Sequence, residues 1–335
     1  MIQSSAFRLD DRSNVAEVRR AVRQHAARLG WGDTPRADAE IVATELATNL
    51  VKHARDGVIA ITSHPDGRNG VLVLVSVDRG PGMSDVEQCL RDGFSTQGSP
   101  GTGLGAVRRL ARSVDVLSDP SGTVVMAELE HRSGVADADA EPLPFRFAAL
   151  SVAKEGEPVS GDGWACRTHR RGLAVLVCDG LGHGVEAGTV TARAIDRFRS
   201  GGWDTPKEAL AGIDAALKSS RGAAAAVALV DPGAGSVTYC GIGNIAGGIF
   251  GAGRDRRLVS MNGILGGTSQ RMTEFEYEWR EGAVLLVHSD GVSARWQARR
   301  WPALWSRHPG VIAGVVYRDC ARGTDDAVIV AVTGK

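Results

Sequence analysis

The most constraining feature of this sequence is a break in its hydrophobic patterning near the middle of the chain. Residues 131–144 read HRSGVADADAEPLP, where Ala, Asp and Pro replace the apolar periodicity found on either side. The chain has 335 residues, which is more than one hydrophobic core usually supports. We therefore predict two domains, residues 1–130 and 145–335, joined by a linker at 131–144.

The composition excludes several classes of protein. Lys plus Arg and Asp plus Glu each number 39, so no net charge attracts the chain to nucleic acid or to an anionic membrane. The five cysteines are scattered without a C-x-x-C pair, which argues against a disulfide framework or a zinc knuckle. The first residues carry charges where a signal peptide is apolar, and no run approaches the roughly 20 apolar residues of a membrane span. These features predict a cytoplasmic protein.

The first half predicts helices layered on an antiparallel or mixed sheet. Apolar residues recur at helical spacing until Gly30, and Asn14 with Glu17 three residues on resembles a capping box at the start of this helix. The same periodicities predict a helix at 38–54, strands at 57–63 and 71–77, a helix at 106–111, and strands at 113–118 and 123–130.

The second half is predicted to consist mostly of strands. Apolar runs of strand length occur at 146–153, 172–179, 224–231, 236–243, 275–279, 283–290 and 326–332. Helices are predicted at 185–199, 205–219 and 309–320. So many buried strands require two stacked sheets, with the few helices covering the outside.

Three short motifs in the first half could form one nucleotide site. Glu45 and Asn49 lie four residues apart on the helix predicted at 38–54. The motif D-R-G-P-G begins at Asp78 after a strand, and the run G-T-G-L-G at 101–105 precedes a helix, where backbone amides can face a phosphate. That run is neither a P-loop nor a dinucleotide fingerprint. The competing interpretation is that the two polar residues are solvated helix positions and that the glycines are simple turns.

The residue types suit ATP chemistry. Asn49 offers a neutral oxygen to Mg²⁺, Glu45 one turn away can accept a proton, and Asp78 can accept a hydrogen bond from an adenine amino group. In this order and spacing the motifs resemble the Bergerat (GHKL) ATPase fold over roughly residues 8–130. TELATNLVKHA, DRGPGM and GTGLGAVRRLA are most similar to the anti-sigma serine kinases of the RsbT and RsbW kind.

This resemblance assigns roles to individual residues. It implies that Glu45 is the catalytic base, Asn49 the Mg²⁺ ligand and Asp78 the adenine reader. It also implies a turn beneath the adenine, a strand threonine that supports it and a phosphate loop, made respectively by Gly80 and Gly82, by Thr123, and by Gly101, Gly103 and Gly105. The segment 92–103 would be the ATP lid.

Four aspartates of the second half stand at strand ends or tight glycine turns. They are Asp162 in SGDGW, Asp179 in VCDGLGHG, Asp290 in HSDGV and Asp325 in TDDAVIV. Carboxylates from neighbouring strand ends can hold two hard divalent cations close enough to share a water, and Gly180 would let a backbone carbonyl join them. The competing interpretation is that the D-G pairs are hairpin turns.

The pattern S-G-D, D-G-x-G-H-G, S-D-G and D-D resembles the PPM metal-dependent phosphatases, in particular the SpoIIE and RsbX branch, over about residues 145–333. The resemblance implies two Mn²⁺ or Mg²⁺ ions that orient and deprotonate a water for in-line attack on phosphoserine or phosphothreonine. The implied ligands are Asp179 as the bridge, Asp162 and the Gly180 carbonyl beside it, and Asp290 and Asp325 on the other metal, with Asp326 as the alternative to Asp325. We interpret His183 as holding the glycine turn rather than donating a proton, and His288 as a packing residue; no acidic residue for a third metal is apparent.

Together the resemblances imply an α+β protein, a Bergerat-type α/β sandwich followed by a PPM-type αββα sandwich. The implied activity is a bifunctional partner switch, in which an ATP- and Mg²⁺-dependent serine/threonine kinase half opposes a metal-dependent phosphatase half. The implied partner is a STAS-domain antagonist or sensor protein of a stress response. The alternative is a first half that only binds ATP and docks the phosphatase or sequesters a sigma factor. Glu45 favours the kinase, because a pure binder does not need a base.

Overall fold

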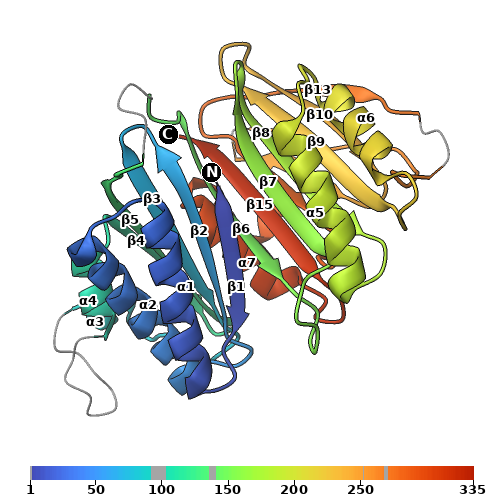
Figure 1. Cartoon of the computed structure of the whole chain (residues 1–335). Helices are drawn as coiled ribbons and strands as arrows, with labels where there is room; N and C mark the ends of the chain where they lie inside the picture. The colour runs from blue at the N-terminus through green and yellow to red at the C-terminus, as the bar shows by residue number, and fades with distance from the viewer. Residues whose placement is uncertain (1, 92–102, 136–140, 252, 268–270) are drawn as a thin grey trace. The chain divides into compact units, whose positions relative to one another are not determined.

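The computed structural model describes residues 2–91, 103–135, 141–251, 253–267 and 271–335, whose contacts divide the chain into two compact units (Figure 1). The first unit comprises Met1–Leu143 and Gly310–Asp319, and the second comprises Pro144–Pro309 and Cys320–Lys335. A short segment of the range predicted for the second domain therefore groups by its contacts with the first unit. In the described ranges, no helix is both long and apolar enough to cross a membrane.

The first unit contains one antiparallel sheet in the order β1-β2-β3-β5-β4. Its strands are β1 (Gln3–Arg8), β2 (Val58–Asp66), β3 (Asn69–Val77), β4 (Ser113–Asp119) and β5 (Gly122–Arg132). The helices are α1 (Arg12–Arg28), α2 (Asp33–His53), the single turn α3 (Val86–Cys89) and α4 (Gly103–Leu110). The sequence predicted the pattern of this unit but not β1, whose residues QSSAFR carry little apolar signal.

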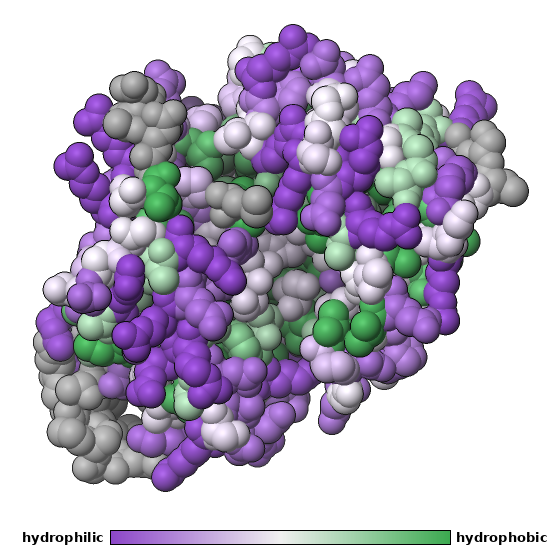
Figure 2. All heavy atoms as spheres, in the orientation of Figure 1, coloured by the Kyte–Doolittle hydropathy of each residue, from purple (hydrophilic) through white to green (hydrophobic). Residues whose placement is uncertain are grey.

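The helices α1 and α2 lie across one face of this sheet (Figure 1). Val22 and Leu46 from the helices share a core with Ile61, Leu74 and Val125 from the strands. Along each of these strands the residues of this core are spaced two apart, as expected for one face of a sheet. The outward face of α1 is mostly hydrophilic (Figure 2).

The start of α1 differs from the prediction in one respect. Asp11 is the N-cap, because its Oδ1 accepts a hydrogen bond from the Ser13 amide at 2.6 Å. The Asn14 side chain completes the capping box by accepting from the Asp11 amide at 3.1 Å. The predicted box of Asn14 with Glu17 is therefore wrong by one helical turn, since the preceding aspartate offers the short acceptor that a helix start needs.

The second unit contains two antiparallel sheets, in the orders β13-β10-β9-β8-β7 and β12-β11-β14-β15-β6. The first is built from β7 (Asp162–His169), β8 (Gly172–Gly180), β9 (Ala223–Asp231), β10 (Ser236–Ile242) and β13 (Glu274–Glu278). The second is built from β6 (Phe145–Val152), β11 (Ala246–Phe250), β12 (Arg256–Arg257), β14 (Val284–His288) and β15 (Ala327–Gly334). The predicted two stacked sheets are confirmed, although β7, β11 and β12 were not foreseen.

Helices α5 (Gly184–Ser200) and α6 (Pro206–Leu217) pack on the sheet that contains β8 and β9 (Figure 1). Two 3₁₀ turns occur at Ala298–Arg300 and Leu304–Ser306. The helix predicted at 309–320 is α7 (Pro309–Cys320), and it is the segment that groups with the first unit. Val311, Ile312, Val315 and Val316 of this helix are fully buried, as is typical of a helix that is apolar on all sides.

Candidate functional site

A pocket of about 500 Å³ in the first unit lies beside α2 and the segment that follows β3. Five residues predicted to bind nucleotide line it together with Glu45, the predicted base: Asn49, Asp78, Gly82, Gly103 and Thr123. They come from segments up to 78 positions apart (123 − 45). They meet because α2 packs on the sheet in which β3 ends just before Asp78 and β5 contains Thr123.

Backbone contacts position Asp78 in this pocket. Its amide donates to the Thr123 carbonyl at 2.9 Å, and its Oδ1 accepts from the Gly80 amide at 2.6 Å. Burial raises the pKa of Asp78, and the Gly80 N–H bond acts in the opposite direction. The carboxyl is thus held by local geometry at the end of β3, where it can accept a hydrogen bond.

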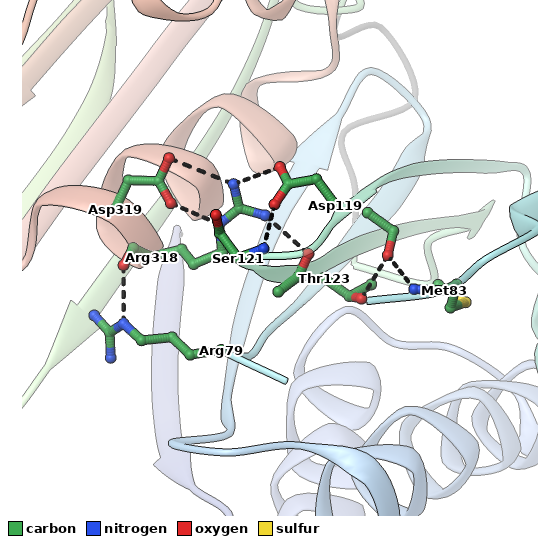
Figure 3. Close-up of polar contacts among 9 residues, drawn as sticks. Arg79, Met83, Asp119, Ser121, Thr123, Arg318 and Asp319 are labelled. Carbon is green, nitrogen blue, oxygen red and sulfur yellow. Dashed lines mark hydrogen bonds and ion pairs between the residues drawn. The ribbon is translucent and has the colours of Figure 1, made fainter. Parts of the chain in front are cut away.

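Glycine is required at the turn below Asp78. Gly82 has φ +77°, and a Cβ at this position would lie 2.3 Å from the Asp119 carbonyl oxygen. The next residue, Met83, donates its amide to Ser118 Oγ at 2.7 Å, and this hydroxyl pairs with Thr123 Oγ1 at 2.8 Å (Figure 3). A pair of hydroxyl groups on β4 and β5 therefore holds the turn against the sheet.

Glu45 occupies a position that its neighbour Asn49 does not share. Both are half-buried, one turn apart on α2, and both line the pocket. Glu45 also lines a second hollow, on the outer side of α1 and α2, together with Arg19, Arg23 and Ile41. A base at Glu45 would therefore be accessible from the nucleotide pocket and from an open surface.

The predicted aspartates of the second unit are presented by adjoining strand ends. Asp162 begins β7 and is the direct cross-strand partner of Asp179 near the end of β8. Asp290 is the second residue after β14, and Asn244 lies between β10 of one sheet and β11 of the other. Its Nδ2 donates to Asp179 Oδ2 at 3.2 Å and to Asp290 Oδ2 at 2.8 Å.

The charges at this centre are incompletely compensated. Asp162 is 6% exposed, and its Oδ2 is buried without a hydrogen-bond partner. Burial, followed by the neighbouring Asp179, raises the pKa of Asp162, while burial followed by Asp290 raises the pKa of Asp179. Bound cations would relieve this repulsion, so the residues present fit a site for hard divalent metal.

Within the described ranges, however, no three His, Cys, Asp or Glu side chains gather closely enough to form a complete metal cage. Divalent cations in this centre would thus draw further ligands from backbone carbonyls such as that of Gly180, and from water. Gly180 is buried, and its amide donates to the Gly161 carbonyl at 3.2 Å.

The adjacent aspartates at the start of β15 differ in their surroundings. Asp326 is 2% exposed, and its two oxygens accept the amides of Lys154 and Gly161 at 2.8 and 2.9 Å. Asp325 is exposed and accepts the Asp326 amide at 2.9 Å. Asp326 therefore holds both ends of the loop between Lys154 and Gly161, which leads to Asp162. Asp325 is the carboxylate that is accessible to a cation.

Comparisons with known proteins match each half separately. Residues 7–129 match the family described as histidine kinase-like ATPase domain, and residues 169–333 match Stage II sporulation protein E (SpoIIE). Serine/threonine-protein kinase RsbT of Bacillus subtilis (strain 168) is 34% identical over 110 residues, 33% of this chain and 83% of RsbT. The chain joins an RsbT-family domain to a domain that matches the SpoIIE family model. Both resemblances predicted from the motifs are thereby confirmed.

Further similarities concern the SpoIIE side and the fold. Phosphoserine phosphatase RsbX of Bacillus subtilis (strain 168) is 25% identical over 141 residues, 42% of this chain and 71% of RsbX. A solved structure described as "The bacterial stressosome: a modular system that has been adapted to control secondary messenger signaling" has TM-score 0.53 and 24% identity. The match covers 56% of this chain and 98% of the chain in that structure. It indicates a shared fold and nothing about a shared activity. The predicted α+β class with two domains is confirmed.

Two predicted residues of the RsbT-like domain that the structure describes lie outside the pocket wall. Gly80 orients Asp78 from behind, as described above, and Gly105 is buried within α4. Gly101 and residues 92–102 of the lid predicted at 92–103 lie outside the described residues. The structure thus brings together the helix, strand-end and threonine residues of the predicted site, and one of its three loop glycines, Gly103.

Sequence reasoning missed two polar residues of the SpoIIE-like domain. Asn244 was overlooked because it stands alone in GIGN, although an amide directly after an apolar strand is itself a signal. Glu157 contacts His183 Nδ1 through Oε1 at 2.6 Å, and His183 is the N-cap of α5.

His288 is fully buried, with its Nδ1 contacting the Ser289 carbonyl at 2.9 Å, as a packing residue would be. The five cysteines are free.

Proposed function

We propose that this chain adds phosphate to, and removes it from, one regulatory protein. The RsbT-like domain would phosphorylate a serine or threonine of a STAS-domain protein, and the SpoIIE-like domain would hydrolyse the resulting phosphoester. The observation that carries the proposal is the position of Glu45, which lines the nucleotide pocket and an open surface hollow at once. A residue in that position can reach a hydroxyl delivered by another protein.

The kinase step needs only residues of the first unit and MgATP. Asp78 would accept a hydrogen bond from the adenine amino group, and the Asn49 side-chain oxygen would bind Mg²⁺. Glu45 would take the proton of the acceptor hydroxyl as its oxygen bonds to the γ-phosphorus and the bond to the β-phosphate oxygen breaks, releasing ADP. Positioning and charge supply most of the rate in such transfers.

The phosphatase step would use the aspartate centre of the second unit. Two divalent cations, when bound, supply the charge that lowers the pKa of a water. Asp179 would contact both cations, with Asp162 on one side and Asp290 and Asp325 on the other. The amide of Asn244 would keep the Asp179 and Asp290 carboxylates at a constant spacing, because it donates to both. RsbX is named a phosphoserine phosphatase, which supports this assignment.

One experiment tests both steps in sequence. The full chain is incubated with γ-labelled ATP, Mg²⁺ and a panel of STAS-domain proteins; unreacted ATP is then removed enzymatically and Mn²⁺ is added. We expect label on a serine or threonine of one partner, and its loss after Mn²⁺. Glu45→Ala should prevent labelling, whereas Asp179→Asn should preserve the label. If the chain binds ATP and the partner but transfers no label, the first half acts as a nucleotide-dependent docking module.

A further inference from the structure

Helix α7 covers the face of the first unit's sheet that α1 and α2 leave open. A Cβ on Gly314 would lie 2.6 Å from Val124 Cγ1 and 3.2 Å from Val77 Cγ2, so the helix backbone contacts the strands directly. Val125 belongs to the core shared with α1 and α2, and Val124 therefore points to the opposite face. By its sequence, however, α7 lies within the range that matches SpoIIE.

Near its C-terminus, α7 carries a buried arginine that bonds to the turn between β4 and β5. The side chain of Arg318 is 2% exposed, and its Nη2 forms an ion pair with Asp119 Oδ2 at 2.9 Å (Figure 3). Its Nη1 donates to the Gly122 carbonyl at 2.9 Å, and its Nε donates to Asp319 Oδ1 at 2.7 Å. The Arg318 side chain is held in one geometry by these partners, because the loss of one partner leaves part of its buried charge uncompensated.

The turn that Arg318 contacts packs against two residues that line the nucleotide pocket, Asp78 and Gly82. A Cβ on Gly122 would lie 1.9 Å from the Asp78 carbonyl oxygen, and one on Gly82 would lie 2.3 Å from that of Asp119. The residue after Asp78 contacts α7 as well, since Arg79 Nε donates to the Arg318 carbonyl at 2.9 Å (Figure 3). A shift of the Asp78 segment therefore requires a shift of Arg318.

The chain passes from α7 into the second unit between Asp319 and Cys320. There the Cys320 carbonyl accepts the Ser293 amide at 2.9 Å, and the Arg322 amide donates to the Gly291 carbonyl at 2.9 Å. Residues 320–322 are thus paired with the segment that directly follows Asp290, and they precede Asp325 by three residues. The same short stretch adjoins two of the proposed metal ligands.

We propose that α7 couples the two sites, so that nucleotide in the RsbT-like domain and metal in the SpoIIE-like domain each raise the affinity for the other. The proposal rests on the proposed function of the two sites. A nucleotide packed against Asp78 and Gly82 would order the 119–122 turn and Arg318 with it. The next ligand then binds to a segment that has already lost part of its conformational freedom, which gives positive cooperativity.

The test measures Mn²⁺ binding to the full chain by calorimetry, with and without saturating ADP in excess Mg²⁺. Because ADP itself binds metal, the titration is repeated with Asp78→Ala, which lacks the adenine contact, and only the difference between the proteins is used. We expect Mn²⁺ to bind at least about fivefold more tightly when ADP is bound. By reciprocity, ADP should bind about fivefold more weakly to Asp179→Asn, measured in Mn²⁺, than to the wild type.

The variant that breaks the route is Asp119→Asn, which keeps the size of the side chain but removes the carboxylate charge that pairs Arg318 with the β4–β5 turn. It should bind ADP and Mn²⁺ separately and reduce the coupling below about twofold. Glu87→Gln is the matched control, because Glu87 pairs with Arg108 on the surface of the same unit and should leave coupling unchanged. Arg318→Lys should lose coupling in the same way as Asp119→Asn.

Equal Mn²⁺ affinities with and without bound ADP would overturn the coupling while leaving both sites intact. Coupling that persists in Asp119→Asn and Arg318→Lys would overturn the route through α7. A chain that binds no ADP would overturn the nucleotide site itself, and with it this inference. The calorimetric binding of ADP alone separates that outcome from the other two.

Discussion

The nucleotide pocket and the aspartate centre are built on opposite principles. In the pocket, polar groups are held by backbone atoms, as Asp78 is by the Gly80 amide and the Thr123 carbonyl. In the aspartate centre, carboxylates face one another, and Asp162 keeps a buried oxygen without a partner. The first site is defined by the positions of its backbone and side chains, whereas the second is defined by negative charge that a cation would neutralise.

This difference predicts how each site should respond to change. A site defined by close backbone packing depends on glycines such as Gly82, and single side chains there tune affinity or rate. A site defined by crowded carboxylates depends on cations, so its occupancy controls both the chemistry and the local pKa values. Asn244 is the one neutral donor shown to bridge two of those carboxylates among the described residues.

The largest effect should come from Asp179→Asn. Loss of the carboxylate that we propose contacts both cations should reduce Mn²⁺-dependent hydrolysis of a phosphoserine peptide. The reduction should exceed the roughly 100-fold that removal of a hydrogen-bond partner of a metal ligand costs. Calorimetry should show weaker Mn²⁺ binding in parallel. ATP binding measured without Mn²⁺ serves as the control for folding, because Asp179 lies in the other unit and the proposed coupling requires Mn²⁺ at its site. Full hydrolysis in the presence of a chelator would contradict the metal assignment.

Glu45→Ala should produce the next largest effect, confined to the first unit. Removal of a general base costs about 100-fold or more in rate, so phosphotransfer to the partner should fall by that factor. Affinity for ATP, measured by calorimetry, should stay within about twofold of the wild type. Asn49→Ala is the contrasting variant, since loss of the proposed Mg²⁺ ligand should weaken MgATP binding instead. Unchanged transfer in Glu45→Ala would assign the base elsewhere.

Asn244→Ala tests whether an outer partner positions the carboxylates. We expect Mn²⁺ affinity to fall by roughly 10- to 100-fold, with hydrolysis restored at high Mn²⁺ concentration. Asn244→Asp should be worse, because it adds a negative charge to a centre where like charges already raise the pKa of Asp179. Equal Mn²⁺ affinity in all three proteins would show that this amide does not organise the site.

The smallest effect concerns pH and the first unit alone. His25 is 2% exposed, contacts Ser5 Oγ and Ser63 Oγ at 3.0 and 2.7 Å, and has a pKa lowered to about 4 by burial. In the unfolded chain His25 protonates near pH 6.5. The stability that its neutral ring contributes to the folded state is therefore present above that pH and is lost as the pH falls toward 4. His25→Gln should remove about 1–2 kcal/mol of this acid sensitivity.

Amide hydrogen exchange of α1 and β2 peptides at pH 7 and 4.5 measures the free energy of opening in this unit. Wild type and His25→Gln should converge at acid pH and separate at neutral pH. Parallel pH dependences in the two proteins would show that His25 is not the group responsible. Peptides from the second unit provide the comparison within the same sample.

Much of the fold could be predicted from the chain because its signals are local. The bounds of α7 agree with the predicted 309–320, since twelve apolar-rich residues between a proline and a turn have few alternatives. The edge strands were harder, because β1 and β7 carry mixed residues whose strand conformation depends on a partner. The start of α1 was missed because two nearby residues could each provide a cap.

The sequence by itself determined the chemistry that each half contains, since aspartates at strand ends and a Glu-x-x-x-Asn helix depend on spacing within a single element. Only the tertiary structure decided which residues meet across elements. Asp325 is exposed while Asp326 accepts two backbone amides, although the two are adjacent. Arg318 reaches Asp119 across 199 positions. Local periodicity carries no information about such contacts, because they depend on the packing of whole helices and sheets.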